Sequence, residues 1–370
     1  MASSERTLSL RELNRTNLAR QHLLERTNVG VGDVVGRLVA LQAQLAQAPY
    51  VGLWTRLADF ARDDLASEIE RKHIVKATFL RGTLHLLTAE DYLRFRPTLQ
   101  PVLTSALEEI VKQRGAVVDV PTLVDAAREF IRTQPRSFAE ITTLLTGLVP
   151  DGDPGAMRYA VRTHLPMVQV PVQKRWSFPG NPQFTLAEGW LGTTLPLAER
   201  LPDLVKRYLA AFGPATVKDI ETWSYVSDLQ PVVEELRSEL VVYRAEHSRR
   251  SELFDLPDLP ITPSDVDAPV RFLPEFDNLL LAHQDRTRVV PKAHRSRVYL
   301  PGLRVAATIL VDGFAAGAWT TERVKQTARL VISPFEALSK PHRAELTEEG
   351  ERLVRFIEPD ATAHEVRIVE

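Results

Sequence analysis

The chain of 370 residues contains no cysteine, which excludes disulfides, iron–sulfur clusters and zinc sites built on thiolates. It also lacks a hydrophobic run long enough to span a bilayer, and its first residues contain no apolar signal segment. The net charge is only −2, so the overall charge gives no support for nucleic-acid binding. These absences predict a cytoplasmic protein that does not associate with a membrane.

Histidine is sparse, with nine residues scattered along the chain and none in a metal-binding HExxH spacing. We therefore expect neither a metal ion nor another cofactor. The composition is 44% hydrophobic and 25% charged, which is ordinary for globular domains. A chain of this length has room for two to four such domains, each with its own core.

One pattern recurs three times: short helices are followed by two β-rich runs that indicate a hairpin. In the first unit, Ser9 and Glu12 form a capping-box pattern at the start of a helix. Further helices are predicted near 31–41 and 61–71, and strands over 73–80 and 83–87. Helices followed by a hairpin are the arrangement of a winged helix, a common DNA-binding fold.

The second and third units repeat this order. The second has predicted helices over 123–132, from Ser137 onward and over 155–164, then a strand pair within 167–178. In the third, a helix ends at Phe212, another begins at Thr216, a third covers 231–240, and a wing starts at Val241.

After the third unit the sequence changes to short strands and turns, with a long helix over roughly 340–356 and a final strand. The predicted class is α+β, with three tandem winged-helix units and a C-terminal β-barrel-like module. The predicted boundaries are 1–110, 111–195 and 196–262 for the units and 263–370 for the module. Repetition supports this organisation because one misplaced boundary does not destroy it.

Gln42 and Gln44 stand two residues apart, just after the second predicted helix. On a helix this spacing would point their amides in nearly opposite directions. In an extended segment both amides would lie on one side, with Ala43 toward the core. The helical pattern weakens at Leu41 and Pro49 follows closely, so we expect an extended or irregular segment. Taken alone, such a pair more often indicates solvated polar residues than a site.

The neighbourhood of this pair changes its interpretation. Segments 38–44, 80–87, 208–216 and 272–281, in this order, resemble the AlkZ-like DNA glycosylase family. The resemblance extends over roughly residues 38–290, which is most of the chain. It implies tandem winged helices plus a β-barrel, shaped as a curved DNA channel. It also implies removal of N7-alkylated purines and, in some members, unhooking of interstrand crosslinks.

The catalytic motif of that family is Gln, an aliphatic residue, then Gln or Asp. It falls on Gln42, Ala43 and Gln44, although alanine is small for the middle position. The form with two glutamines resembles the branch that protects antibiotic producers from their own products. The form with Asp is associated with broader repair enzymes.

A side-chain amide has no useful pKa, so neither glutamine can serve as an ordinary general base. An N7-alkylated guanine is already cationic, however, and leaves without being protonated. Amide oxygens can then hold a water beside C1′ and face the positive charge that develops on the sugar. Our hypothesis is that Gln44 orients the water, while Gln42 stabilises the sugar cation or fixes the nucleotide.

Candidates for DNA contact come mainly from a run that has six Lys or Arg between residues 286 and 311 and no acid. We expect β-structure there, presented as a hairpin to phosphates or a groove. The candidate residues are Arg286, Arg288, Lys292, His294, Arg295, Arg297, Lys174, Arg175, Arg249, Arg250 and His85. For His85 the pattern favours a half-buried structural histidine over DNA contact, because it shares a strand face with Thr83 and Leu87.

The sequence thus predicts a monofunctional DNA glycosylase that hydrolyses the N-glycosidic bond of bulky N7-alkylated purines, in repair or in antibiotic self-resistance. Interstrand crosslinks are a further candidate substrate. We expect a monomer whose partner is double-stranded DNA carrying alkylated purines. The alternative is a non-catalytic winged-helix DNA-binding regulator, since winged helices are most often used in that way. A protein-interaction scaffold would leave the basic run unexplained.

Overall fold

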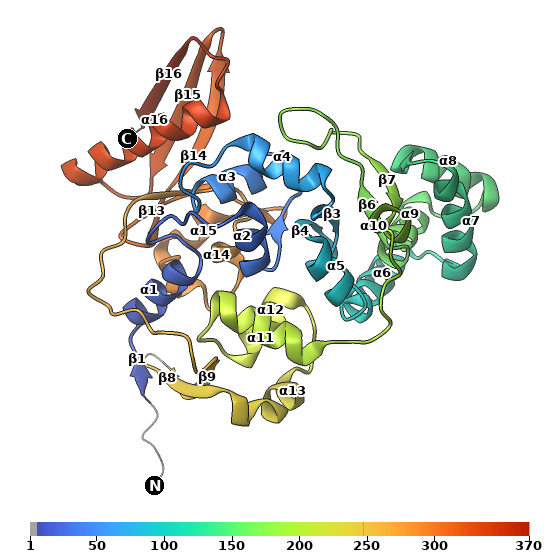
Figure 1. Ribbon diagram of the computed structural model, residues 1–370, viewed down its shortest axis with the longest axis horizontal. Helices are drawn as coiled ribbons and strands as arrows, with labels where there is room; N and C mark the ends of the chain where they lie inside the picture. Colours follow the sequence, from blue (N-terminus) through green and yellow to red (C-terminus); the bar gives the residue numbers. More distant parts are fainter. Residues whose placement is uncertain (1–5, 247, 370) are drawn as a thin grey trace.

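The computed structural model describes residues 6–246 and 248–369, with the backbone alone for 248–250. Groups of consecutive helices are followed by groups of strands along the chain, which confirms the α+β class (Figure 1). The first unit contains α1 (Leu10–Arg20), α2 (Val31–Arg37), α3 (Ala48–Trp54), α4 (Arg62–Glu70) and the hairpin of β3 (Ile74–Thr78) and β4 (Leu84–Thr88). The predicted capping box is present, since the Glu12 carboxylate accepts from the Ser9 amide at 2.8 Å. Helix α3 was not predicted.

The second unit contains α7 (Val120–Thr133), α8 (Phe138–Leu148) and α9 (Pro154–His164), preceded by α5 (Ala89–Phe95) and α6 (Gln100–Arg114). Its strands are β6 (Met167–Gln169) and β7 (Gln183–Leu186), with α10 (Ala187–Leu191) after them. The prediction that both strands lie within 167–178 is wrong. Residues 170–182 form a loop, because prolines at 171, 179 and 182 remove the amide donors that a strand needs.

The hairpins of the first two units join in one sheet. Its order is β2-β4-β3-β6-β7-β5, where β2 is Leu41–Gln42 and β5 is Arg136–Ser137. Ala77 of β3 pairs with Val168 of β6 across the two units. The predicted boundary at residue 110 falls inside helix α6, and the hairpins on either side of it share this one sheet.

The third unit comprises α11 (Leu201–Phe212), α12 (Val217–Ser224), α13 (Gln230–Glu235), β8 (Val241–Ala245) and β9 (Ser248–Asp255). Its hairpin is extended by β1 (Thr7–Leu8), which runs parallel to β8. Helix α11 ends at Phe212 and Thr216 caps α12, both as predicted. Helix α13 ends before residue 240, because a 3-10 turn over Arg237–Glu239 replaces its last part.

The C-terminal module contains a five-stranded sheet of β10 (Arg271–Leu273), β13 (Thr308–Val311), β14 (Phe314–Val324), β15 (Thr327–Pro334) and β16 (Ala363–Ile368). Helix α16 (Lys340–Ile357) packs against this sheet (Figure 1). The strand order is linear, so the described strands form an open sheet where a β-barrel-like module was expected. A helix on one face covers the sheet without closing it.

One hydrophobic core joins the first unit to the C-terminal module. It contains Trp54 of α3 and Leu353 of α16. It also contains Phe272 and Trp319, whose ring centroids are 5.8 Å apart. The segment that carries Gln42 and Gln44 is thus backed by residues from the far end of the chain. Among residues 6–246 and 248–369, no helix is both long and apolar enough to cross a membrane.

Candidate active site and DNA-contact residues

Gln42 and Gln44 lie at the edge of the six-stranded sheet, where β2 pairs with β4 and Gln42 stands opposite His85. Ala43 is buried against the core, Gln42 is buried and Gln44 is exposed. Gln42 Nε2 donates to Gln44 Oε1 at 2.5 Å. Leu41 and Gln42 are extended and Gln44 lies in a bend, which confirms the expected extended or irregular segment. The hydrogen bond places the two amides on one side of it, and Ala43 faces the core.

The backbone before this pair is held by the C-terminal module. Asn278, in the short helix α14 (Asn278–Leu281), donates from Nδ2 to the Ala40 carbonyl at 2.5 Å and to the Leu38 carbonyl at 3.3 Å. No local sequence pattern singles out Asn278, although it lies in segment 272–281. A side chain that acts on a carbonyl 238 positions away leaves no local signal.

Arg81 contacts the pair directly and was also missed. Its Nη2 donates to Gln42 Oε1 at 2.8 Å, and its Nη1 donates to the Trp223 carbonyl at 2.7 Å. Burial lowers the pKa of Arg81 to about 10, so the guanidinium stays cationic at neutral pH. The site therefore combines two amides and one cation.

His85 is fully buried beneath this group. Its Nδ1 lies 3.1 Å from the Thr83 carbonyl and its Nε2 lies 3.4 Å from Arg81 Nη2. Burial, and then the charge of Arg81, lower the pKa of His85 to about 3, so the ring is neutral. Its buried position contradicts contact with DNA and supports a structural role.

A cavity of about 500 Å³ lies beside Arg81, between α6 and the end of α12. Tyr225 caps α12 with a left-handed backbone (φ 64°) and leaves 61% of its surface exposed at this cavity. The apolar residues that line it are Pro101, Val102, Ala106, Leu201 and Val226. The rest of the lining is polar or charged, with Arg81, Thr98, Ser105, Glu199 and Ser227, so an apolar wall stands beside polar groups.

The part of the basic run that carries the candidate residues, 286–297, does not form the predicted β-hairpin. Residues 286–298 form two 3-10 turns, Arg286–Arg288 and Lys292–His294, and helix α15 (Arg295–Val298), followed by the small pair β11 (Tyr299–Leu300) and β12 (Arg304–Val305). Arg286 donates to the Leu280 carbonyl at 2.6 Å and lies over the Tyr299 ring. Charge alone cannot distinguish a phosphate contact from such internal bonds.

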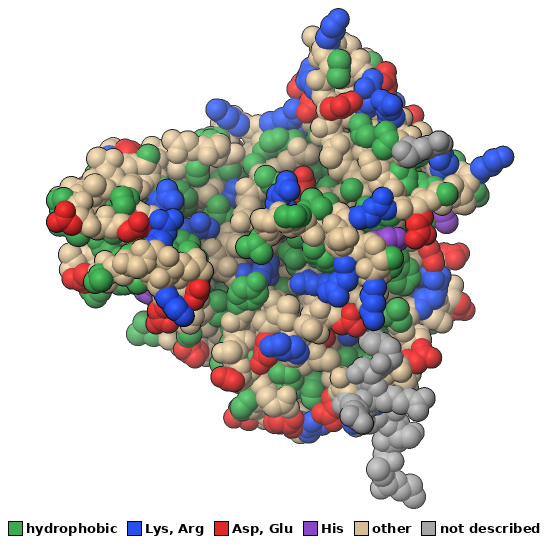
Figure 2. Space-filling view, turned by 180° about the vertical axis from the view of Figure 1, so that it is seen from behind, with side chains coloured by type: hydrophobic (Ala, Val, Ile, Leu, Met, Phe, Trp, Pro, Cys, Tyr) green, Lys and Arg blue, Asp and Glu red, His purple; other side chains and the backbone are tan. Residues whose placement is uncertain are grey.

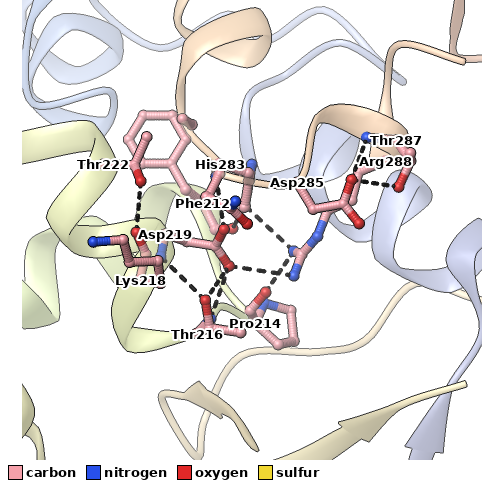
Figure 3. A network of polar contacts seen from close by, with 12 residues as sticks. Phe212, Pro214, Thr216, Lys218, Asp219, Thr222, His283, Asp285, Thr287 and Arg288 are labelled. Carbon is pink, nitrogen blue, oxygen red and sulfur yellow. Dashed lines mark hydrogen bonds and ion pairs between the residues drawn. The ribbon is translucent and has the colours of Figure 1, made fainter. Parts of the chain in front are cut away.

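Arg288 is buried, which contradicts its predicted contact with DNA. Its Nη1 donates to the Pro214 carbonyl at 2.5 Å, and it lies 3.9 Å from the carboxylate of Asp219 (Figure 3). Asp219 also accepts from the Thr216 hydroxyl and from the backbone N–H of Gln284, both at 2.8 Å. This network attaches the segment around Arg288 to the start of α12.

The other predicted contacts differ in exposure. Lys292, Arg295 and Lys174 are exposed, and Arg297 is exposed while bonded to the Phe335 carbonyl at 2.6 Å. Two candidates are engaged within the protein: His294 with Glu336 at 3.0 Å and Arg175 with Glu358 at 3.3 Å. The side chains of Arg249 and Arg250 lie outside the described part of the chain. On the face seen in Figure 2, Lys and Arg spread across the middle, while most Asp and Glu lie toward the margins.

No group of three His, Asp or Glu side chains within the described residues could hold a metal ion.

The chain matches the AlkZ-like DNA glycosylase family over residues 35–356, and it therefore belongs to that family. It is accordingly a DNA glycosylase. A curated relative, the interstrand DNA cross-link repair glycosylase of Streptomyces sahachiroi, is 26% identical over 357 residues, which cover 88% of this chain and 91% of that protein. The solved structure of Streptomyces sahachiroi DNA glycosylase AlkZ superimposes with a TM-score of 0.79 at 24% identity, covering 98% of this chain and 100% of that one. This likeness shows a shared fold.

Proposed function

We propose that this glycosylase hydrolyses the N-glycosidic bond of bulky N7-alkylated purines in double-stranded DNA, with Gln42 and Gln44 as the catalytic residues. One observation carries the proposal: within the described residues, the hydrogen bonds of these two amides go to each other and to Arg81. None of these groups can protonate a departing base at neutral pH, and neither can neutral His85. The substrate must therefore bring its own activation, as a purine cation alkylated at N7 does.

In this reaction the C1′–N9 bond breaks and its electron pair leaves with the purine, which becomes neutral. The oxygen of a water bonds to C1′, and the proton of that water passes to solvent. Gln44 is the exposed member of the pair, so its amide is the one that can hold the water. The dipole of the Gln44 amide also stabilises the positive charge on the sugar ring without a proton transfer.

The wider fold supports contact with a long piece of duplex. We propose that the three helix-and-hairpin units, 1–110, 111–195 and 196–262, act as winged helices, and that 263–370 forms a module that packs behind the site. Exposed Lys292, Arg295, Arg297 and Lys174 are the proposed phosphate contacts. The cavity beside Arg81 supports a bulky rather than a small adduct, because its lining can cover an apolar substituent.

The Streptomyces sahachiroi relative is named for interstrand cross-link repair. We propose that crosslinked purines are also substrates here, in repair or in self-resistance to an antibiotic. A crosslinked base cannot be flipped freely out of the duplex, and an exposed glutamine at a sheet edge does not require full extrusion. The cytoplasmic location and the monomeric state remain predictions.

The test uses duplex DNA with a single nitrogen-mustard adduct at guanine N7. Treatment with the protein and then with mild alkali should cleave the strand at an abasic site. Gln44→Ala should lose this cleavage and keep most of its DNA binding. Gln47→Ala is the matched control, because Gln47 precedes α3 and its side chain makes no capping bond. A protein that binds duplex but leaves every N7 adduct intact would support the regulator instead.

A further inference from the structure

The Gln42 amide lies between a group that can only donate and a second amide. A guanidinium has no acceptor, so the Gln42 atom 2.8 Å from Arg81 must be the carbonyl oxygen. The NH₂ group of Gln42 then faces Gln44, and the Gln44 atom at 2.5 Å must be its oxygen. The orientation of both amides thus follows from the presence of Arg81.

Arg81 is itself fixed on two sides. Its Nη1 bonds the Trp223 carbonyl at 2.7 Å, which ties it to α12 of the third unit. The neutral His85 donates from Nδ1 to the Thr83 carbonyl at 3.1 Å, so its Nε2 is an acceptor aimed at Arg81 at 3.4 Å. Hydrogen-bond directions are therefore defined from Thr83 through to Gln44.

We infer that Arg81 is a positioning residue that sets the orientation of the Gln42 amide and so assigns different tasks to the two glutamines. Gln42 donates to Gln44, and its oxygen is occupied by a cation, so it does not present an oxygen to the sugar. Gln44 Oε1 keeps one lone pair, on the exposed side of the pair, to hold the water. This assignment replaces the hypothesis that Gln42 stabilises the sugar cation, and it rests on the proposed function.

Without Arg81 the side-chain amide of Gln42 can flip by 180°, which exchanges the positions of its oxygen and nitrogen. Its oxygen then meets the oxygen of Gln44, and the two repel, so Gln44 turns away from the position that holds the water. A displacement of about 1 Å in a reacting group can cost roughly 100-fold in rate. For Arg81→Met we expect the single-turnover rate to fall by about 10- to 100-fold, with little change in the Kd for DNA.

A double-mutant cycle separates this role from general structural support. Single-turnover rates on the mustard-adduct duplex are measured for the wild type, Arg81→Met, Gln42→Ala and the double variant. If Arg81 acts through Gln42, the double variant should be no slower than Gln42→Ala alone. The inference would be overturned if Arg81→Met slowed the reaction by the same factor in the Gln42→Ala background as it does in the wild-type background.

Arg162→Met is the matched control. Arg162 also supports the turn that carries Arg81, through the Gly82 carbonyl at 3.2 Å, but it does not touch the glutamines. Its rate should stay close to that of the wild type even if its Tm falls. Should Arg81→Met not fold, Arg81→Lys enters the same cycle, because the shorter side chain cannot bond Gln42 and Trp223 together.

A second readout does not depend on activity. In protein labelled with ¹⁵N at the Gln side chains, the Gln42 NH₂ signals, assigned by their loss in Gln42→Ala, should show one slowly exchanging, hydrogen-bonded proton. Arg81→Met should remove that protection, and Arg162→Met should keep it. A wild type inert on all adducts would refute the proposed function, while these spectra would still decide the amide orientation. Unprotected Gln42 protons in the wild type would overturn the inference.

Discussion

Asp277→Ala is expected to destabilise the protein more than most single changes. Asp277 forms a two-bond ion pair with Arg56, at 2.8 and 2.9 Å, and the exposed fractions of the two side chains are 1% and 0%. This pair joins the end of α3 to the start of α14, and so joins the first unit to the C-terminal module.

The magnitude follows from the burial. Removal of one partner of a buried ion pair costs about 3–5 kcal/mol, because the remaining charge stays desolvated without compensation. The other bonds of Arg56, to the Gly52 carbonyl at 2.8 Å and to Gln21 at 3.3 Å, supply dipoles but no negative charge. An exposed pair is worth about 0–1 kcal/mol, and Arg329–Glu365, with exposed fractions of 27% and 51%, provides that reference.

The assay is urea unfolding, monitored by tryptophan fluorescence, of the wild type, Asp277→Ala and the reference variant Glu365→Ala. The first variant should lose about 3–5 kcal/mol and the reference less than about 1 kcal/mol. Equal losses in the two variants would refute the reasoning, because burial would then not determine the cost. The glycosylase rate of Asp277→Ala should also fall, since Asp277 caps the turn that presents Asn278 to the site.

Four further outcomes are expected. Asn278→Leu should lower the single-turnover rate more than DNA affinity, because it frees the Ala40 carbonyl just before the pair; equal losses of both would contradict this. Charge removal at exposed Lys292 and Arg295 should reduce the salt dependence of duplex binding by about one unit of slope each, as measured by fluorescence anisotropy. Burial lowers the pKa of His85 to about 3, so the unfolded chain binds the extra proton below its ordinary pKa near 6.5. The contribution of His85 to the free energy of unfolding is therefore complete above about pH 6.5 and falls by about 1.4 kcal/mol per pH unit toward pH 3. His85→Gln should remove this part of the pH dependence, as measured by urea unfolding at several pH values. Val102→Trp, which fills the cavity beside Arg81, should slow excision of a bulky N7 adduct and spare N7-methylguanine in the same gel assay.

Local patterns in the sequence predicted the parts of the fold that depend on neighbouring residues. Capping boxes at Ser9, Ser137 and Thr216 all begin helices, because a cap and the amide it bonds are three residues apart. The inward position of Ala43 follows from the two-residue period of extended backbone in the same way.

The errors concern features that depend on distant partners. The second hairpin was placed too early, because a β-rich run does not reveal which strand it pairs with, and Met167 in fact pairs with Leu186. The basic run was assigned to phosphates as a whole, because a charge count does not show that Arg288 meets the Pro214 carbonyl. Arg81 and Asn278 were missed for the same reason, since their partners are 39 and 238 positions away.

The four segments that carry the family resemblance meet through these long-range bonds. Segment 38–44 supplies the glutamines, and segment 80–87 supplies Arg81 and His85. Segment 272–281 supplies Asn278, which holds the backbone before the pair. Segment 208–216 anchors the end of that last segment, because the Tyr208 hydroxyl donates to the Ala282 carbonyl at 2.7 Å. A side-chain amide is neutral, so its orientation is set by the hydrogen-bond donors and acceptors around it. A site with two amides therefore needs rigid hydrogen-bond partners, which here come from several units. The four segments that carry the resemblance thus meet at or next to the proposed catalytic pair, although they are far apart in the sequence.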